Sequence, residues 1–172
     1  MAAPDPDFER LFLAHYDGLV KSLTVITGDR ELARDCVQDA FIKASASWPR
    51  VRRYDDPASW IRRVAINRSR DLHRAGQRRR KRERLVAPPA DGPAPDRTGE
   101  IPGLMRLVDL LRDLPERQQI TAALFYIGDL PVAEIATTLG VSEGAVKFNL
   151  SQARTALRAI VEHQDTGDWR HG

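Results

Sequence analysis

The feature that most constrains the fold is the spacing of apolar residues, which recur at three- and four-residue steps along most of the chain. One such stripe runs from Phe8 to Ile26, and another follows through the segment from Arg30 to Trp48. This spacing places apolar side chains on one face of an amphipathic helix. No segment shows sustained alternation with a period of two, so the sequence predicts an all-α fold.

A stretch rich in proline and glycine divides the chain into two parts. Residues 87–103 read APPADGPAPDRTGEIPG and hold five of the eleven prolines. We predict a flexible linker over 85–103 that joins two small helical domains, 1–84 and 104–163, with a tail at 164–172. As a coil the linker spans about 23 Å, and roughly 55 Å when extended. The two domains are therefore free to bind separate parts of a long partner without touching each other.

Glycine and proline also mark the expected helix ends. Gly28 separates the first two helices, Pro49 ends the second, and a loop from Arg50 to Pro57 precedes the third. Proline and glycine disfavour helix interiors, which makes these residues natural boundaries. We expect helices over residues 8–26, 30–48, 59–74, 104–114, 116–127 and 132–139, and from residue 142 onward.

The most specific local signal is a helix-turn-helix pattern in the second domain. Such a motif needs a small residue where the helices cross, a residue that tolerates positive φ in the turn, and an aliphatic residue on the second helix. Ala136, Gly140 and Val146 meet these needs, and Ser142 is a good N-cap. The alternative is an αα-hairpin that serves only for packing.

If the second helix of this motif reads DNA, its open side carries the candidate contacts. With Val146 at the centre of the buried stripe, the residues opposite it face a major groove. Phe148 has three interpretations, which are contact with a thymine methyl, contact with a protein partner, and packing into the core. The candidate DNA-contacting residues here are Ser142, Gly144, Lys147, Phe148, Ser151, Gln152 and Arg154.

The charge is unevenly distributed, although the net charge of the chain is only +3. Residues 50–84 hold 14 basic and 4 acidic groups, whereas residues 1–49 have a net charge of −3 and residues 85–172 a net charge of −4. A basic block of this density binds polyanions, because each cation placed at a phosphate releases counterions. The alternative is a solvated helix face or a basic tail.

The basic segment also contains groups that read bases. Trp48, Tyr54 and Trp60 flank the loop before the third helix, and aromatic rings beside a cationic groove stack on unpaired bases. The competing interpretation makes Trp48 and Trp60 core residues, and it is the favoured one for Trp60. The candidate contacts in this segment are Trp60, Arg62, Arg63, Asn67, Arg68, Arg70 and Arg74.

Several function classes are disfavoured. The histidines lie far apart, and there is no phosphate-binding glycine loop or cysteine-histidine cluster, so we expect no catalytic centre, no metal and no cofactor. The lone Cys36 is expected to be a buried small hydrophobe. The apolar runs are too short for a membrane span and the acidic start lacks a signal peptide, which predicts a cytoplasmic protein.

Taken in order, the motifs resemble a known family. The chain contains RELARDCVQDAFIKASASW, then PASWIRRVAINRSRDLHRAGQRRR, and after the linker LPERQ and AEIATTLGVSEGAVK. Together they resemble the extracytoplasmic-function (ECF) group of bacterial RNA polymerase sigma factors, which retain only the second and fourth conserved sigma regions. The resemblance covers about residues 8–84 and 104–162.

The resemblance implies a set of partners. It implies that the chain binds core RNA polymerase through the β′ coiled-coil and the β subunit, with the β′ contact carried by Asp35, Gln38, Asp39 and Phe41. The basic segment would capture and melt the minus-ten promoter element, and the helix-turn-helix would read the minus-thirty-five element. An anti-sigma factor is expected as a further partner. The alternatives are a stand-alone helix-turn-helix regulator with an N-terminal dimerisation or sensing module, and a nucleic-acid-processing enzyme.

The chain departs from the family pattern on the reading helix. Where relatives commonly carry a small residue followed by arginines, this chain has Phe148, Asn149, Ser151 and Gln152. Fewer cations leave fewer phosphate contacts, so we predict that this domain alone binds DNA more weakly than a more basic relative.

Overall fold

The computed structural model describes residues 5–86 and 103–168, and every element assigned in these two ranges is an α-helix. This confirms the predicted all-α fold. The linker predicted from composition lies almost entirely outside the described residues. The helices are α1 (Pro6–Thr27), α2 (Arg30–Ala46), α3 (Trp48–Val51), α4 (Pro57–Val86), α5 (Leu104–Arg112), α6 (Glu116–Tyr126), α7 (Val132–Leu139) and α8 (Glu143–Asp168).

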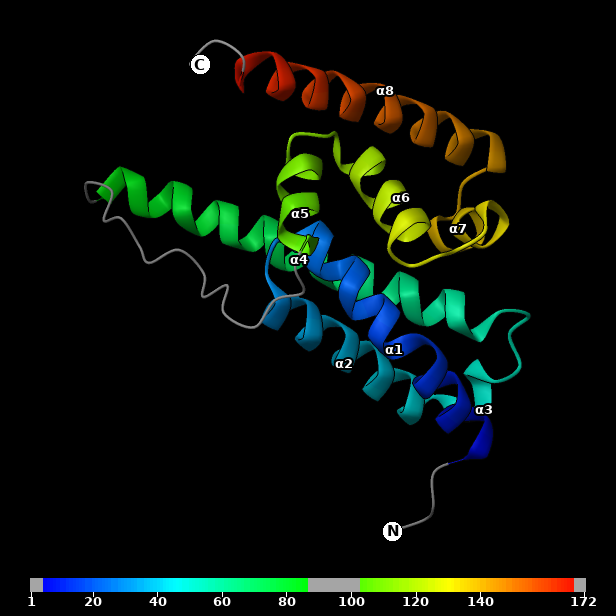
Figure 1. Cartoon of the computed structure of the whole chain (residues 1–172). Helices are drawn as coiled ribbons and strands as arrows, with labels where there is room; N and C mark the ends of the chain where they lie inside the picture. The colour runs from blue at the N-terminus through cyan, green and yellow to red at the C-terminus, as the bar shows by residue number, and fades with distance from the viewer. Residues whose placement is uncertain (1–4, 87–102, 169–172) are drawn as a thin grey trace.

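The turn between α1 and α2 follows from its local sequence. Gly28 ends α1 in the left-handed region with φ 70°, a conformation that costs glycine little. Asp29 then caps α2, because its carboxylate accepts a hydrogen bond from the Leu32 amide at 3.0 Å. The two helices therefore reverse direction within two residues and lie side by side (Figure 1).

The main departures from the predicted helices are at Pro49 and at the end of α4. Pro49 does not end a helix but sits in the first turn of the short helix α3, where a missing amide proton costs nothing. The third predicted helix, α4, continues for thirty residues to Val86, well past Arg74. Arginine, lysine and glutamine are good helix formers, so the basic run that follows Gly76 extends the helix.

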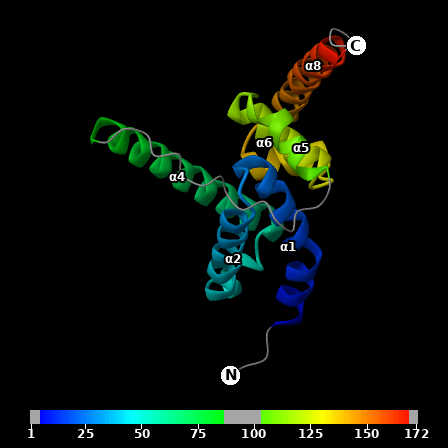
Figure 2. The ribbon, with the colours of Figure 1, turned by 60° about the vertical axis from the view of Figure 1, so that its left-hand side comes forward.

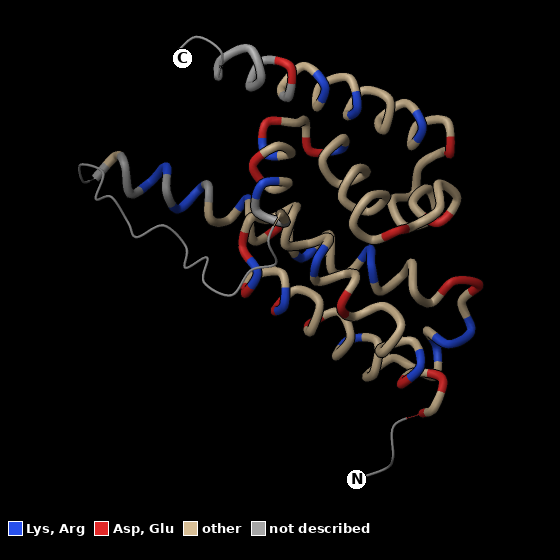
Figure 3. Tube along the Cα trace, viewed as in Figure 1, with Lys and Arg blue, Asp and Glu red and all other residues tan. Residues whose placement is uncertain are grey.

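The N-terminal domain is built from α1, α2 and α4. Its core contains Leu23, Val37 and Ile61, each at most 1% exposed, together with Cys36 at 0%. The C-terminal half of α4 projects beyond the helices of both domains, and this projection carries many of the basic residues (Figures 2 and 3).

The C-terminal domain consists of α5 to α8 and contains the predicted helix-turn-helix. Gly140 forms the turn between α7 and α8 with φ 66°, and Val146 is fully buried. Ser142 caps α8, since its Oγ accepts a hydrogen bond from the Ala145 amide at 3.1 Å. Helix α8 runs on to Asp168, so part of the predicted tail is helical.

The two domains pack against each other, which differs from the expectation of modules that do not touch. Leu19 and Leu23 of α1 share one buried cluster with Leu124 of α6, Ile135 of α7 and Val146 of α8. A second cluster joins Val25 of α1 to α5, α6 and α8. The apolar stripe of α1 is wide enough to serve both domains, and this unites them in one body (Figures 1 and 2).

Candidate nucleic-acid and protein interfaces

One face of α2 combines acidic, polar and apolar side chains at the surface. Asp35 and Gln38 are exposed, Asp39 is half-buried, and Ile42 is 58% exposed. These positions recur at three- and four-residue steps and therefore lie on one face. Asp39 accepts a hydrogen bond from Arg68 Nε on α4 at 3.3 Å. Asp35, Gln38 and Asp39 are the residues of this face that were predicted to contact a protein partner.

Phe41, which was grouped with them, is placed differently. It is only 4% exposed, and its ring centroid lies 5.0 Å from that of Phe12, 5.9 Å from Tyr16 and 6.2 Å from Phe8. Its ring is therefore part of the core between α1 and α2 and presents no surface to a partner in this structure. The prediction of direct contact is corrected to a supporting role beneath the α2 face.

The candidate minus-ten residues on α4 have different surroundings in the structure. Asn67, Arg68 and Arg74 are exposed, and Arg63 is exposed as well. Arg63 and Arg70 are both bonded to the C-terminal domain. Arg70 donates from Nε and Nη2 to the Glu116 carboxylate at 2.9 and 2.7 Å. This paired hydrogen bond lowers the pKa of Glu116 below its usual range.

Arg63 binds the end of α7. Its Nε donates to the Thr138 carbonyl oxygen at 3.0 Å, and its Nη2 donates to the carbonyl oxygen of Thr137. The last carbonyl oxygens of a helix carry partial negative charge and have no hydrogen-bond donor within the helix. The guanidinium of Arg63 supplies both a positive charge and the missing donors.

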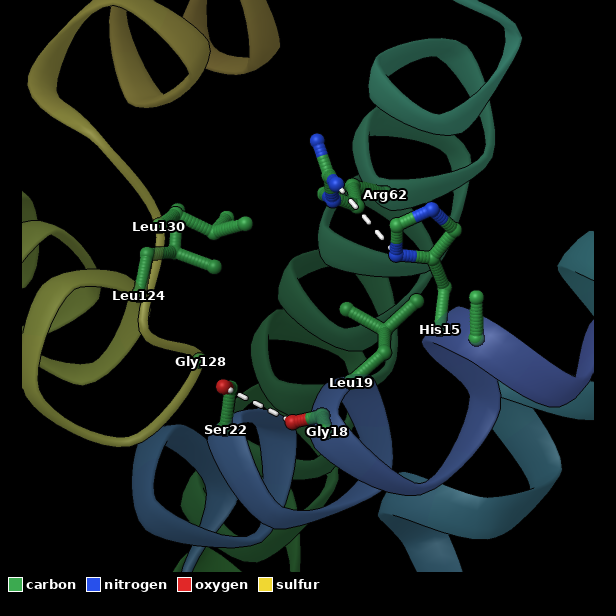
Figure 4. Close-up of a pocket in the computed structure, with 9 residues that line it drawn as sticks. His15, Gly18, Leu19, Ser22, Arg62, Leu124, Gly128 and Leu130 are labelled. Carbon is green, nitrogen blue, oxygen red and sulfur yellow. Dashed lines mark hydrogen bonds between the residues drawn. The ribbon is translucent and has the colours of Figure 1, made fainter. Parts of the chain in front are cut away.

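Arg62 is buried, although the sequence predicts it as a DNA contact of the basic segment. Its side chain is 4% exposed and its Nη2 lies 3.1 Å from Oε2 of Glu134 on α7. The same nitrogen lies 3.5 Å from His15 Nδ1, across a small hollow where the two domains meet (Figure 4). Burial and the neighbouring guanidinium lower the pKa of His15.

The aromatic residues before α4 divide between core and surface. Trp48 is 8% exposed and belongs to the core, as the competing interpretation held. Trp60 is half-buried and packs against the core, while Tyr54 is 37% exposed, with its ring centroid 6.3 Å from that of Trp60. The pair Tyr54 and Trp60 therefore presents a partly open aromatic surface beside the basic helix.

Helix α8, the second helix of the helix-turn-helix, has the open face that its sequence predicts. Lys147 is exposed and lies 3.9 Å from Glu143, one turn before it. Phe148 is 63% exposed, so it does not fold back into the core, and contact with DNA or with a protein partner remains. The candidate contacts Ser142, Gly144, Lys147, Phe148, Ser151, Gln152 and Arg154 are all exposed.

Sequence reasoning missed the residues that hold these arginines. Arg154 Nε donates to the hydroxyl of Tyr126 at 2.7 Å, and its guanidinium lies 5.9 Å from the Phe125 ring centroid. Glu116 and Glu134 were likewise not singled out. Lone acids and aromatics on separate helices carry no spacing signal, because their pairing arises only when the helices pack together.

Within residues 5–86 and 103–168, no group of three or more histidine, cysteine or acidic side chains is arranged to hold a metal ion. In the same part of the chain, no helix combines the length and apolar character needed to cross a membrane.

Comparison with known families matches both domains. Residues 11–80 match the model described as Sigma-70 region 2, and residues 104–157 match the model described as Sigma-70, region 4. The two matches fall on α1 to α4 and on α5 to α8, in the order of the two predicted domains.

Similar proteins extend over nearly the whole chain. The ECF RNA polymerase sigma factor SigM of Mycobacterium tuberculosis is 28% identical over 161 residues, which cover 93% of this chain and 80% of SigM. The RNA polymerase sigma-E factor of Streptomyces avermitilis is 27% identical, with 92% of this chain and 87% of that protein covered.

Solved structures share the fold. The sigma factor RpoE, in complex with the anti-sigma factor NepR from Bartonella quintana, gives a TM-score of 0.72 at 20% identity, covering 92% of this chain and 98% of RpoE. CnrH, in complex with the cytosolic domain of CnrY, gives a TM-score of 0.65 at 24% identity, covering 91% of this chain and 88% of CnrH. With both conserved regions present in order, the chain belongs to the extracytoplasmic-function group of the sigma-70 family.

Proposed function

We propose that the chain is a sigma factor that binds core RNA polymerase, directs it to specific promoters and helps to melt the minus-ten region. The observation that carries this proposal is the presence of region 2 and region 4 matches on one chain, in order and on separate helical domains. As an initiation factor it performs no covalent chemistry itself, and it acts in the cytoplasm, where polymerase and promoter DNA are found.

The α2 face is the proposed polymerase contact. Asp35, Gln38 and Asp39 supply acceptors for cationic partner groups, and exposed Ile42 adds an apolar contact at the same face. Interfaces of this kind combine a few apolar anchors with polar groups at the rim. Phe41 holds this face in place from below.

The two DNA contacts are assigned to different helices. We assign the minus-ten element to α4, where arginines track phosphates, Asn67 reads a base edge and Trp60 with Tyr54 offers a ring surface to an unstacked base. We assign the minus-thirty-five element to the open face of α8. Lys147 and Gln152 there are suited to guanine and adenine edges.

An anti-sigma protein is the proposed third partner. The two solved relatives are described in complexes, RpoE with the anti-sigma factor NepR and CnrH with the cytosolic domain of CnrY. The exposed apolar residues Leu13, Ile42 and Phe148 lie on separate helices, so a protein that covers them would contact both domains.

Runoff transcription with purified core polymerase on a pool of genomic fragments tests the proposal. The full chain is expected to give promoter-specific transcripts where core polymerase alone gives none. Asp35→Asn is expected to weaken core binding, and Asp17→Asn makes the same charge change at an exposed position on α1 as a matched control. No transcript from any fragment would overturn the proposal and favour a stand-alone regulator.

A further inference from the structure

A tyrosine of α6 is hydrogen-bonded to an arginine on the open face of α8. Arg154 Nε donates to the hydroxyl of Tyr126 at 2.7 Å, and both side chains are exposed. We propose that Tyr126 and Arg154 form one phosphate-binding unit, in which Tyr126 is a positioning residue that lies outside the helix-turn-helix. The inference rests on the proposed function, in which α8 contacts the minus-thirty-five element, and adds a contact to the DNA backbone beside that element.

The hydrogen bond between the two side chains leaves donors for a phosphate. It uses the Nε–H of Arg154, so the four N–H groups on the two terminal nitrogens of the guanidinium take no part in it. The Tyr126 hydroxyl accepts this bond and keeps its own proton to donate. An exposed guanidinium beside a hydroxyl donor therefore matches the acceptor oxygens of a phosphate group.

The aromatic rings of α6 also hold the guanidinium in place. Phe125 is half-buried against the core, and the central carbon of the Arg154 guanidinium lies 5.9 Å from its ring centroid. The rings of Phe125 and Tyr126 meet edge to face, with centroids 5.0 Å apart and an angle of 86° between their planes. A cation over an aromatic face is attracted by the ring quadrupole. Arg154 is therefore held by a ring and by a hydroxyl before DNA binds.

Holding an arginine in advance reduces the entropy that DNA binding costs. A free arginine side chain samples many rotamers, and it loses this freedom when it is fixed on a phosphate. Positions 148–152 of α8 read FNLSQ and contain no cation, so each cation that remains on this helix supplies a larger share of the phosphate contacts. A positioned Arg154 therefore compensates in part for the missing cations.

The place of Arg154 along α8 favours a phosphate over a base edge. Lys147, Arg154 and Arg158 are exposed and recur at steps of seven and four residues, which places them on one stripe of the helix (Figure 3). At a rise of about 1.5 Å per residue, Arg154 lies about 10 Å further along the axis than Lys147. The major groove is about 12 Å wide, so when the first turn of α8 enters it, Arg154 lies near a strand that borders the groove.

The packing beneath the pair shows that the hydrogen bond is not needed to join the two helices. Leu124 of α6 and Leu150 of α8 share one buried cluster. Ala123 and Ala153 share the other. Tyr126 is 48% exposed, and changes at exposed positions away from the core have little effect on stability. Tyr126→Phe is therefore expected to leave the melting temperature unchanged.

A double-mutant cycle on DNA binding tests the phosphate-binding unit. Binding of the full chain to a fluorescent DNA duplex of random sequence is measured by anisotropy at several salt concentrations. Tyr126→Phe is expected to weaken binding by about fivefold, because it removes the hydroxyl and retains the ring. Arg154→Ala is expected to reduce the slope of log affinity against log salt by about 1. Tyr126→Phe added to Arg154→Ala is expected to cause a further loss of at most about twofold.

Two variants serve as matched controls. Tyr16→Phe removes the same hydroxyl from a ring that packs against Phe12 and Phe41 in the N-terminal domain. Arg112→Ala removes the same charge within the C-terminal domain, at an exposed residue that pairs with Asp109 on its own helix. Both controls are expected to bind the duplex as the wild type does, and thermal unfolding checks that every variant folds.

The outcomes separate this inference from the proposed function, because the assay contains neither polymerase nor a promoter. The phosphate-binding unit is wrong if Tyr126→Phe binds as tightly as the wild type or loses no more than Tyr16→Phe. It is also wrong if Tyr126→Phe loses as much affinity beside Arg154→Ala as alone, or if the wild type does not bind even at the lowest salt. Promoter-specific runoff transcription would still support the sigma-factor function in each case. If the coupling is found and no genomic fragment yields a transcript, the unit stands and the sigma-factor function is wrong.

Discussion

Replacing Phe41 separates a core role from a partner-contact role. The ring is 4% exposed and lies among Phe8, Phe12 and Tyr16, with centroids 5.0–6.2 Å away. Truncation of a buried phenylalanine to alanine costs about 3–5 kcal/mol, through lost transfer free energy and the cavity left behind. Against a total unfolding free energy of about 5–15 kcal/mol, Phe41→Ala is expected to leave the N-terminal domain marginal.

Phe41→Leu retains most of the volume and is expected to cost about 1–1.5 kcal/mol. Ile42→Ala changes the neighbouring residue, which is 58% exposed, and is expected to alter the unfolding free energy by at most about 0.5 kcal/mol. Urea unfolding followed by circular dichroism measures all three variants. Binding to core polymerase, measured by fluorescence anisotropy, gives the second readout.

The two neighbours are expected to behave in opposite ways. Ile42→Ala retains stability and weakens polymerase binding, whereas Phe41→Leu loses some stability and retains binding. The reasoning is refuted if Phe41→Leu abolishes polymerase binding while its unfolding free energy stays within about 0.5 kcal/mol of wild type.

Four further predictions concern single residues. Gly140→Ala is expected to cost about 1–2 kcal/mol, measured by thermal unfolding, because φ is 66° there; an unchanged melting temperature would contradict this. Lys147→Ala is expected to reduce the slope of log affinity against log salt by about 1, measured on promoter fragments with holoenzyme; an unchanged slope would remove Lys147 from the phosphate contacts. Burial raises the pKa of Cys36 to about 11, so iodoacetamide is expected to label it at about pH 8 only after denaturation; rapid labelling of the folded chain would show that the site opens. The pKa of His15, which faces Arg62, Glu134 and Asp56, is lowered in the folded chain. The folded chain therefore gains stability from neutral His15 at pH values above the ordinary histidine pKa, and this stability is lost as the pH falls below that value. Acidification is therefore expected to loosen the domain contact, and NMR titration of His15 in wild type and in Glu134→Gln checks this; a His15 pKa above the ordinary value would contradict it.

The helices and the helix-turn-helix could be predicted because their signals are local. Apolar spacing marked α1 and α2, and Gly28 and Gly140 occupy positive-φ positions that the local sequence implies. Pro49 was misread because proline both ends one helix and suits the first turn of the next. The sequence around Pro49 does not show whether this proline ends α2 or begins α3.

The site residues were predicted less completely because their surroundings depend on packing between domains. Arg62 has the sequence context of a solvent-facing cation, yet α7 brings Glu134 over it and buries it. Phe41 was placed by family resemblance, which identifies the helix but does not separate a contact residue from the residue that supports it. The partners Glu116 and Tyr126 come from other helices and leave no periodic trace in the sequence.

The covalent connection between α4 and α5 makes the contact between the two domains independent of protein concentration. Both domains belong to one chain, so their association is unimolecular. Dilution of the protein therefore leaves the fraction of molecules with the two domains in contact unchanged, whereas the binding of polymerase and of DNA depends on the concentrations of both partners.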